Sequence, residues 1–312
     1  MNNLRLFEFC RQNPERSLDP AYMFVEKHPK LPLYVKNTKK IKELLITIKT
    51  LHKKKSSEAT LNPIFQDLQK ALRKDANYSE FGAFINACDS YIDSVKQDLG
   101  LLKKVTGIYL QKRDLNEIVP AEWIQALVDK GSARMKGAAG EYKLVRILEA
   151  KKYVFADTFQ KFQNYEKAVA RSSSSGDFSN EGIKRNFRIS IGKGTQDKRL
   201  DLVIKNRHDI YFVEAKHINT SGGGQNKQVS ELINVLRKDV HNKCYHFVAF
   251  LDGVYSNILL EAGLGTTSKK AKNKAQKQKH DILSILKQRS SNYWANTAGF
   301  EKLFSLSSIL KA

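Results

Sequence analysis

The stretch Arg199–His217, RLDLVIKNRHDIYFVEAKH, decides the fold of this chain. Two short apolar runs, RLDLVI and IYFVEAK, flank the polar segment KNRHD, a pattern typical of two β-strands joined by a tight turn. Because side chains alternate along a strand, Glu214 and Lys216 project from one face, and a hairpin partner can bring Asp201 beside them. The sequence therefore predicts two carboxylates and one ammonium group at one site.

These three groups suit the hydrolysis of a phosphodiester, which needs oxygen ligands for a hard divalent cation and a group that orients or deprotonates water. Asp201 and Glu214 would hold Mg²⁺, and Lys216 would act as a general base or as an electrostatic helper. Ala215 and His217 point to the other side of the strand, and we expect His217 to be a core or surface histidine rather than a ligand. The alternative interpretation is a set of surface salt bridges on a hairpin.

The Glu-x-Lys pattern occurs twice more, as Glu141-Tyr142-Lys143 and Glu149-Ala150-Lys151. Both copies lie on or at the end of a helix predicted over about residues 137–150. Residues two apart on a helix point roughly 200° apart, so neither copy can place its Glu and its Lys in one site. Only the strand copy has suitable geometry.

Glu141 nevertheless lies on the apolar stripe of this helix, because Leu144, Val145 and Leu148 follow it at helical spacing. Burying an unpaired carboxylate is costly, which favours Glu141 as a third acid aimed at the metal or at Lys216. The alternative is a Glu at the edge of the stripe that reaches water.

The segment after His217 predicts a parallel crossover: TSGGGQNKQ, a helix with apolar residues at positions 229, 232, 233 and 236, and then the strand CYHFVAFL. Gly222–Gly224 permit close backbone approach, and Gln225, Lys227 and Gln228 near the helix start are candidates for contacts to phosphates or base edges. A flexible hinge is the alternative.

The character of the chain changes near residue 130. Residues 1–130 carry apolar residues at helical spacing and predict an all-helical region, a candidate for DNA recognition or dimerisation. Residues 131–312 alternate helices with short strands and predict an α/β catalytic domain that ends in helices. Two segments, 171–181 and 265–279, are rich in small polar residues or lysine and predict loosely ordered loops.

Charge and composition limit which kinds of partner and which location fit this protein. Lys and Arg number 54 against 32 Asp and Glu, a formal net charge of +22, which favours a polyanion such as nucleic acid; a solubilising surface is the alternative. No apolar run is long enough for a membrane span, the N-terminus lacks the pattern of a secretory signal, and three scattered cysteines fit neither a disulfide framework nor zinc. We expect a cytoplasmic prokaryotic protein.

Taken together, Glu141, Leu200-Asp201 and Glu214-Ala215-Lys216 resemble the PD-(D/E)XK nuclease superfamily, in particular type II restriction endonucleases. The resemblance covers about residues 137–253, and Leu200 stands where the motif has proline. It implies an α/β nuclease core with a mixed central sheet flanked by helices, Asp201 and Glu214 as metal ligands, Lys216 as the catalytic lysine and Glu141 as an auxiliary acid, with Mg²⁺ as cofactor. It also implies a homodimer and, for a restriction enzyme, a companion DNA methyltransferase.

The leading hypothesis is thus a Mg²⁺-dependent endonuclease that cuts double-stranded DNA at a specific sequence. Two alternatives stay open: a structure-specific or repair nuclease such as a Holliday-junction resolvase, and a non-catalytic nucleic-acid-binding protein with a degenerate nuclease fold. Cleavage of branched substrates would distinguish the first, and DNA binding without cleavage would distinguish the second.

Overall fold

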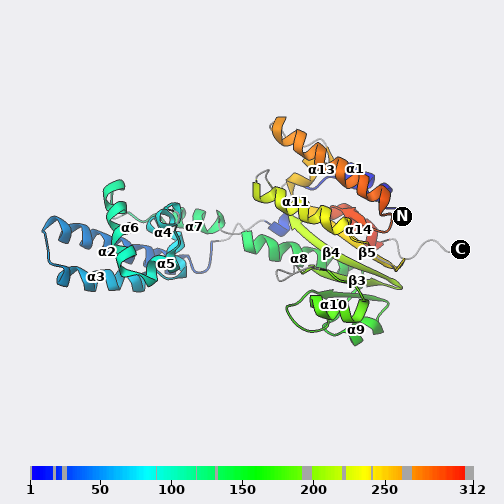
Figure 1. The fold of residues 1–312 in the computed structure, drawn as a ribbon, viewed down its shortest axis with the longest axis horizontal. Coiled ribbons are helices and arrows are strands. Elements are labelled where there is room, and N and C mark those ends of the chain that lie inside the picture. The colour runs from blue at the N-terminus through cyan, green and yellow to red at the C-terminus, as the bar shows by residue number, and fades with distance from the viewer. Residues whose placement is uncertain are drawn as a thin grey trace. The chain divides into compact units, whose positions relative to one another are not determined.

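The computed structural model divides the chain into two compact units, Met1–Met23 with Arg134–Ala312 and Phe24–Ala133. It describes residues 2–16, 19–22, 27–88, 90–116, 118–130, 133–191, 199–219, 223–239, 242–261 and 269–305. The first unit contains a β-sheet and the second is built of helices (Figure 1). The prediction of a mixed sheet flanked by helices, preceded by an all-helical region, is confirmed.

The sheet has six strands in the order β1-β2-β3-β4-β5-β6. Pairs β1–β2, β4–β5 and β5–β6 are parallel, whereas β2–β3 and β3–β4 are antiparallel. The predicted hairpin and the crossover through α11 are both confirmed. The strands are β1 (Val154–Phe155), β2 (Lys167–Arg171), β3 (Leu202–Asn206), β4 (Asp209–His217), β5 (Tyr245–Asp252) and β6 (Tyr293–Ala295).

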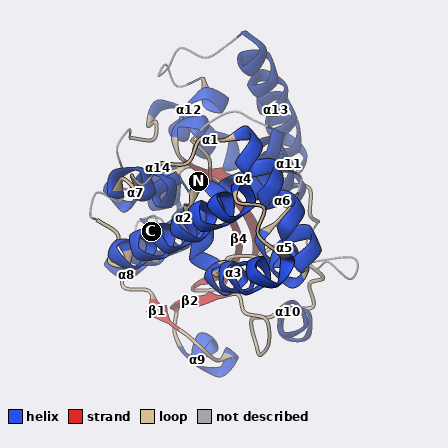
Figure 2. Ribbon diagram, turned by 90° about the vertical axis from the view of Figure 1, so that its left-hand side faces the viewer, coloured by secondary structure: helices blue, strands red, loops and turns tan. Residues whose placement is uncertain are grey.

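Helices cover both faces of the sheet. The Tyr211 ring lies 5.0 Å from Phe304 of α14, and the Phe212 ring, on the opposite face, lies 5.5 Å from Phe187 of α10. Figure 2 shows α8 and α14 on one side of β4, with α10 and α11 on the other. The helices of this unit are α1 (Asn3–Gln12), α8 (Ala133–Ala150), α9 (Phe159–Asn164), α10 (Asn180–Phe187), α11 (Gly223–Leu236), α12 (Val254–Leu260), α13 (Lys269–Gln288) and α14 (Thr297–Ser305), with a 3₁₀ turn at Pro20–Tyr22.

Helix α1 belongs to the sheet unit, whereas the sequence grouped residues 1–130 as one helical region. Leu6, Phe7 and Cys10 are buried in the same core as β4, β5 and α14. The Asn3 side chain donates hydrogen bonds to backbone carbonyls at the end of α13, 2.8 Å from Leu286 O. The other predicted boundary, near residue 130, lies close to the division at Ala133 and Arg134.

The helical unit has its own core, in which Ile41, Leu45 and Ile48 of α2 pack with Phe65 and Leu68 of α3. Its helices are α2 (Leu31–Lys53), α3 (Glu58–Ala71), α4 (Glu80–Ala87), α5 (Ile92–Gln97), α6 (Leu99–Lys112) and α7 (Ala121–Lys130), with a 3₁₀ turn at Lys74–Tyr78. Among the described residues of the whole chain, no helix is both long and apolar enough to cross a membrane.

The Ser-rich segment 171–181 is compact rather than loosely ordered. Ser173 N–H donates to Phe178 O at 3.3 Å, and Phe178 is buried. Ser179 then caps α10, its hydroxyl accepting from Gly182 N–H at 3.0 Å. This N-cap is the usual role of serine at a helix start. In the second segment, 265–268 lie outside the described residues, and Lys269–Lys279 form the start of α13.

Candidate active site

Asp201 lies directly before β3, beside β4 at the open end of the β3–β4 hairpin. The antiparallel register ends with the pair Leu202 and Val213, and Asp201 N–H also donates to Val213 O, at 2.9 Å, so the regular ladder stops at Asp201. Ala215 N–H donates to Asp201 Oδ2 at 2.6 Å and so orients this carboxylate.

Lys216 completes the cluster from the same face of β4. Its ammonium group makes an ion pair with the Glu214 carboxylate, and the Glu214 side chain is buried. Burial alone lowers the pKa of Lys216, but the charge and hydrogen bond of Glu214, followed by the charge of Asp201, outweigh it. The pKa of Lys216 therefore lies above its usual value, and the side chain is an ammonium at neutral pH.

Glu231 of α11 also acts on Lys216, because its negative charge raises the pKa of that ammonium. Helix α11 packs on β4 and β5 on this face, which brings Glu231 near the cluster. The sequence analysis did not single out Glu231. In the sequence, Glu231 stands out only as an acidic residue two positions after Val229 on the crossover helix. Many glutamates occupy positions of this kind, so the sequence alone could not assign it to the site.

Glu141 is half-buried on α8, a helix that covers the face opposite to Phe212. Within the described part of the chain, the ion-pair partner of Lys216 is Glu214, and no ion pair joins Glu141 to Lys216. Alternation along β4 places Glu214 on the Phe212 face. The structure thus brings three of the four predicted catalytic residues together, and the role of Glu141 stays a prediction.

The predicted DNA contacts lie at the start of α11, which follows the end of β4 after a short connection. Lys227 is exposed and Gln228 is half-buried, while the side chain of Gln225 and all of Gly222 lie outside the described residues. Their position at the same end of the sheet as Lys216 follows from the strand direction, since β4 ends at His217 and α11 begins at Gly223. Their contacts to DNA stay a prediction.

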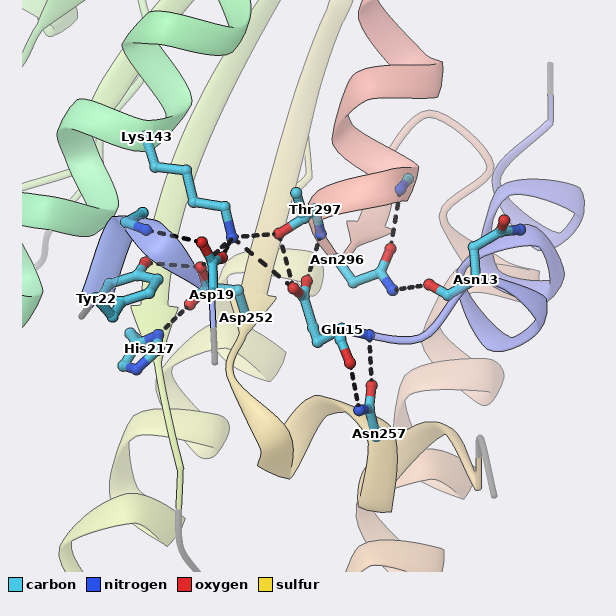
Figure 3. Close-up of polar contacts among 12 residues, drawn as sticks. Asn13, Glu15, Asp19, Tyr22, Lys143, His217, Asp252, Asn257, Asn296 and Thr297 are labelled. Carbon is cyan, nitrogen blue, oxygen red and sulfur yellow. Dashed lines mark hydrogen bonds and ion pairs between the residues drawn. The ribbon is translucent and has the colours of Figure 1, made fainter. Parts of the chain in front are cut away.

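A second polar cluster, which the sequence did not predict, lies at the same end of β4 and β5. We call it the Asp252 network: Glu15, Asp19, Tyr22, Lys143, His217, Asp252 and Thr297 (Figure 3). The fully buried carboxylate of Asp252 accepts from Tyr22 Oη at 2.6 Å and from Lys143 Nζ at 3.0 Å, and lies 2.6 Å from His217 Nδ1. The Tyr22 ring stacks on His217 with centroids 3.7 Å apart.

Lys143 joins this network to the N-terminal segment. Its ammonium donates to Asp19 Oδ2 at 2.6 Å and to Thr297 Oγ1 at 2.7 Å, and it lies 3.8 Å from Glu15. Glu15 in turn accepts from Thr297 N–H at 2.6 Å. One lysine from the helix copy Glu141-Tyr142-Lys143 therefore faces three carboxylates far from it in sequence.

The pKa values of two buried carboxylates in the network are shifted in opposite directions. Burial raises the pKa of Glu15, which Lys143 offsets only in part. Burial also acts to raise the pKa of Asp252, but the hydrogen bond from His217 and the charge of Lys143 outweigh it, so the pKa falls below its usual 3.8. Asp252 is therefore the anionic centre around which His217, Tyr22 and Lys143 are arranged.

Asp252→Asn is expected to make the unfolding free energy depend less on pH in the acidic range. Because the folded pKa of Asp252 is lowered, its ionised form contributes stability that is present above the unfolded pKa of about 4 and lost as pH falls through the folded value. Glu15 has a raised pKa and works in the opposite sense, but both proteins contain it. Urea unfolding from pH 2.5 to 6 measures this, and parallel curves for wild type and variant would contradict it.

Comparison with known proteins concerns the segment that carries most of these residues. No curated protein and no solved structure matches the chain. Residues 152–257 match the family model of the DpnII restriction endonuclease, a segment that includes Asp201, Glu214 and Lys216 but not Glu141. The match covers less than half of the 312 residues and supports a restriction endonuclease.

Proposed function

We propose that this protein is a Mg²⁺-dependent endonuclease of the PD-(D/E)XK type that cuts double-stranded DNA at a specific sequence. The observation that carries the proposal is the gathering of Asp201, Glu214 and Lys216 at one end of the β3–β4 hairpin, within the segment similar to a restriction endonuclease. The net charge of +22 is consistent with a DNA substrate.

The donor set fits a magnesium ion. Asp201 and Glu214 offer two hard carboxylate oxygen donors near the end of the hairpin, and among the described residues no group of three or more His, Cys, Asp or Glu side chains gathers as a metal cage. Mg²⁺ is commonly held by one or two carboxylates, with water and substrate phosphate completing its octahedral shell. When bound, the ion would stabilise negative charge on the phosphate and acidify a bound water.

The residues of the chain have separate parts in this scheme. The Ala215 N–H binds one oxygen of the Asp201 carboxylate and so orients this proposed metal ligand. Lys216, held as an ammonium by Glu214, is suited to position the attacking water and to stabilise charge on the phosphate. The alternative role for Lys216 is that of a general base, which would require the loss of its proton.

Glu141→Gln is expected to slow cleavage by about tenfold, equivalent to about 1.4 kcal/mol in the barrier, if Glu141 acts as the auxiliary acid. The reason is a loss of negative charge near the metal without loss of its main ligands. Single-turnover cleavage at saturating protein measures this effect. Glu149→Gln on the exposed end of the same helix is the matched control, and equal rates for both variants would remove Glu141 from the site.

The experiment that tests the function is incubation of the purified protein with unmethylated phage DNA and Mg²⁺. Discrete bands would support a site-specific endonuclease, whereas a smear would indicate non-specific or repair cleavage. DNA that is bound but never cut, with Mg²⁺ or Mn²⁺, would overturn the enzyme proposal in favour of a binding protein.

Two partners belong to the same proposal. A homodimer would let two copies of the site cut both strands of a symmetric sequence, and sedimentation with and without DNA tests it. A companion methyltransferase would protect the host sequence, and resistance of methylated DNA to cleavage is the corresponding measurement.

A further inference from the structure

We propose that a basic groove on the helical unit binds the phosphate backbone of duplex DNA. The inference rests on the proposed function for the identity of the polyanion and adds a second contact surface, on the unit that does not carry the candidate cleavage site. The groove has a volume of about 1250 Å³. Its cationic lining consists of Lys27, Lys36, Lys39, Lys40, Lys70 and Arg73.

Helical spacing concentrates three of these cations. Lys36, Lys39 and Lys40 lie at positions i, i+3 and i+4 of α2, so they share one face of the helix, and all three are exposed. The next position on that face, Glu43, is the acidic residue among the groove-lining residues. One face of α2 thus presents a row of positive charge to the groove, while Ile41 on another face is buried in the core.

Most of this charge is not neutralised by the protein. Over the described ranges, Lys36, Lys39 and Lys40 make no ion pair. Lys70 and Arg73 have partners, Asp67 at 3.0 Å and Asp75 at 3.7 Å, but these are exposed or loose pairs of small energetic value. The lysine row is therefore available to phosphates and adds to the positive potential that attracts them.

The rest of the lining suits long basic side chains. Leu33 and Val35 contribute apolar surface between the lysines, along which their methylene stems can lie while the ammonium groups reach out. Duplex DNA carries one negative charge per about 1.7 Å of helix axis, so one backbone can meet several adjacent lysines at once.

The same charges argue against the groove as a dimer interface. In a two-fold symmetric dimer each patch meets its own copy, so the lysine rows of two protomers would face each other. Like charges brought together in this way oppose association. Of the two roles expected for the helical region, recognition and dimerisation, this groove fits contact with DNA.

The test compares two triple variants of the full chain. Each variant loses three exposed lysines that lie in α2 or directly after its C-terminal end. The groove triple is K36Q/K39Q/K40Q, and the matched control is K53Q/K54Q/K55Q, which removes the same charge outside the groove. Binding of a fluorescent 30-base-pair duplex in EDTA is measured from low to moderate salt, so that cleavage does not enter. Circular dichroism and urea unfolding establish that both variants fold like wild type.

We expect the groove triple to bind about tenfold or more weakly and its salt slope to become shallower by about 2.7, because each lost phosphate contact removes about 0.9 from the slope. The control should change each value much less. Equal losses in both triples, or no loss in the groove triple, would overturn the inference even if wild type cleaves DNA. Wild type that binds through the groove but never cleaves would overturn only the proposed enzyme function.

Discussion

Lys216→Met is expected to reduce DNA cleavage by about 10²–10³-fold or more while DNA binding and folding are retained. The ammonium of Lys216 is held beside Glu214 and Asp201, where it can position water and stabilise the charge that develops on the phosphate. Methionine keeps the length and apolar stem of the side chain but carries no charge. The loss should therefore appear in the cleavage rate at saturating protein rather than in the dissociation constant of the duplex.

Two further variants make this experiment specific. Asp201→Asn removes a proposed metal ligand, keeps an oxygen that can accept from Ala215 N–H, and should lose cleavage to a similar degree. Lys205→Met is the matched control, because Lys205 lies on the same hairpin but donates to Gln163 O at 2.6 Å, far along the strand. Cleavage by the Lys216 variant at the rate of the Lys205 variant would remove Lys216 from the catalytic set.

The hairpin that carries the candidate site could be predicted because its geometry is local. A period of two along β4 places Glu214 and Lys216 on a single face, and one tight turn joins β4 to the strand that Asp201 precedes. Both features are visible within 19 residues. The same alternation along β4 correctly places the His217 side chain on the opposite face from Lys216. It could not show that His217 meets Asp252, since that contact depends on how β5 returns after α11.

The Asp252 network and the place of α1 depend on contacts across the whole chain. Glu15 meets Thr297 across 282 positions, and Lys143 meets Asp252 across 109, so no motif spacing could indicate either pair. In α1, an apolar stripe predicts burial but does not say which core receives it. The order of segment 171–181 was missed because its serines act as caps and turn residues, a role that composition alone does not distinguish from disorder.

Lys143→Met is expected to cost about 3–5 kcal/mol of unfolding free energy, a large part of the stability of an ordinary domain. Lys143 is the cation that faces Glu15, Asp19 and Asp252, and Asp252 is fully buried. Without the ammonium, these carboxylates remain desolvated with their mutual repulsion uncompensated. Lys151→Met, directly after the end of the same helix, is the matched control, because Lys151 donates only to an exposed serine, Ser305, among the described residues.

The double variant Lys143→Met/Asp252→Asn separates charge compensation from simple loss of packing. If the cost of Lys143→Met arises from an unpaired buried carboxylate, removing the charge of Asp252 should restore part of the lost unfolding free energy. The double variant should then lose less unfolding free energy than the two single variants lose in sum. Urea unfolding at pH 7 gives the three free energies. Strict additivity, or a Lys143→Met cost no larger than that of Lys151→Met, would show that the network does not depend on the Lys143 charge.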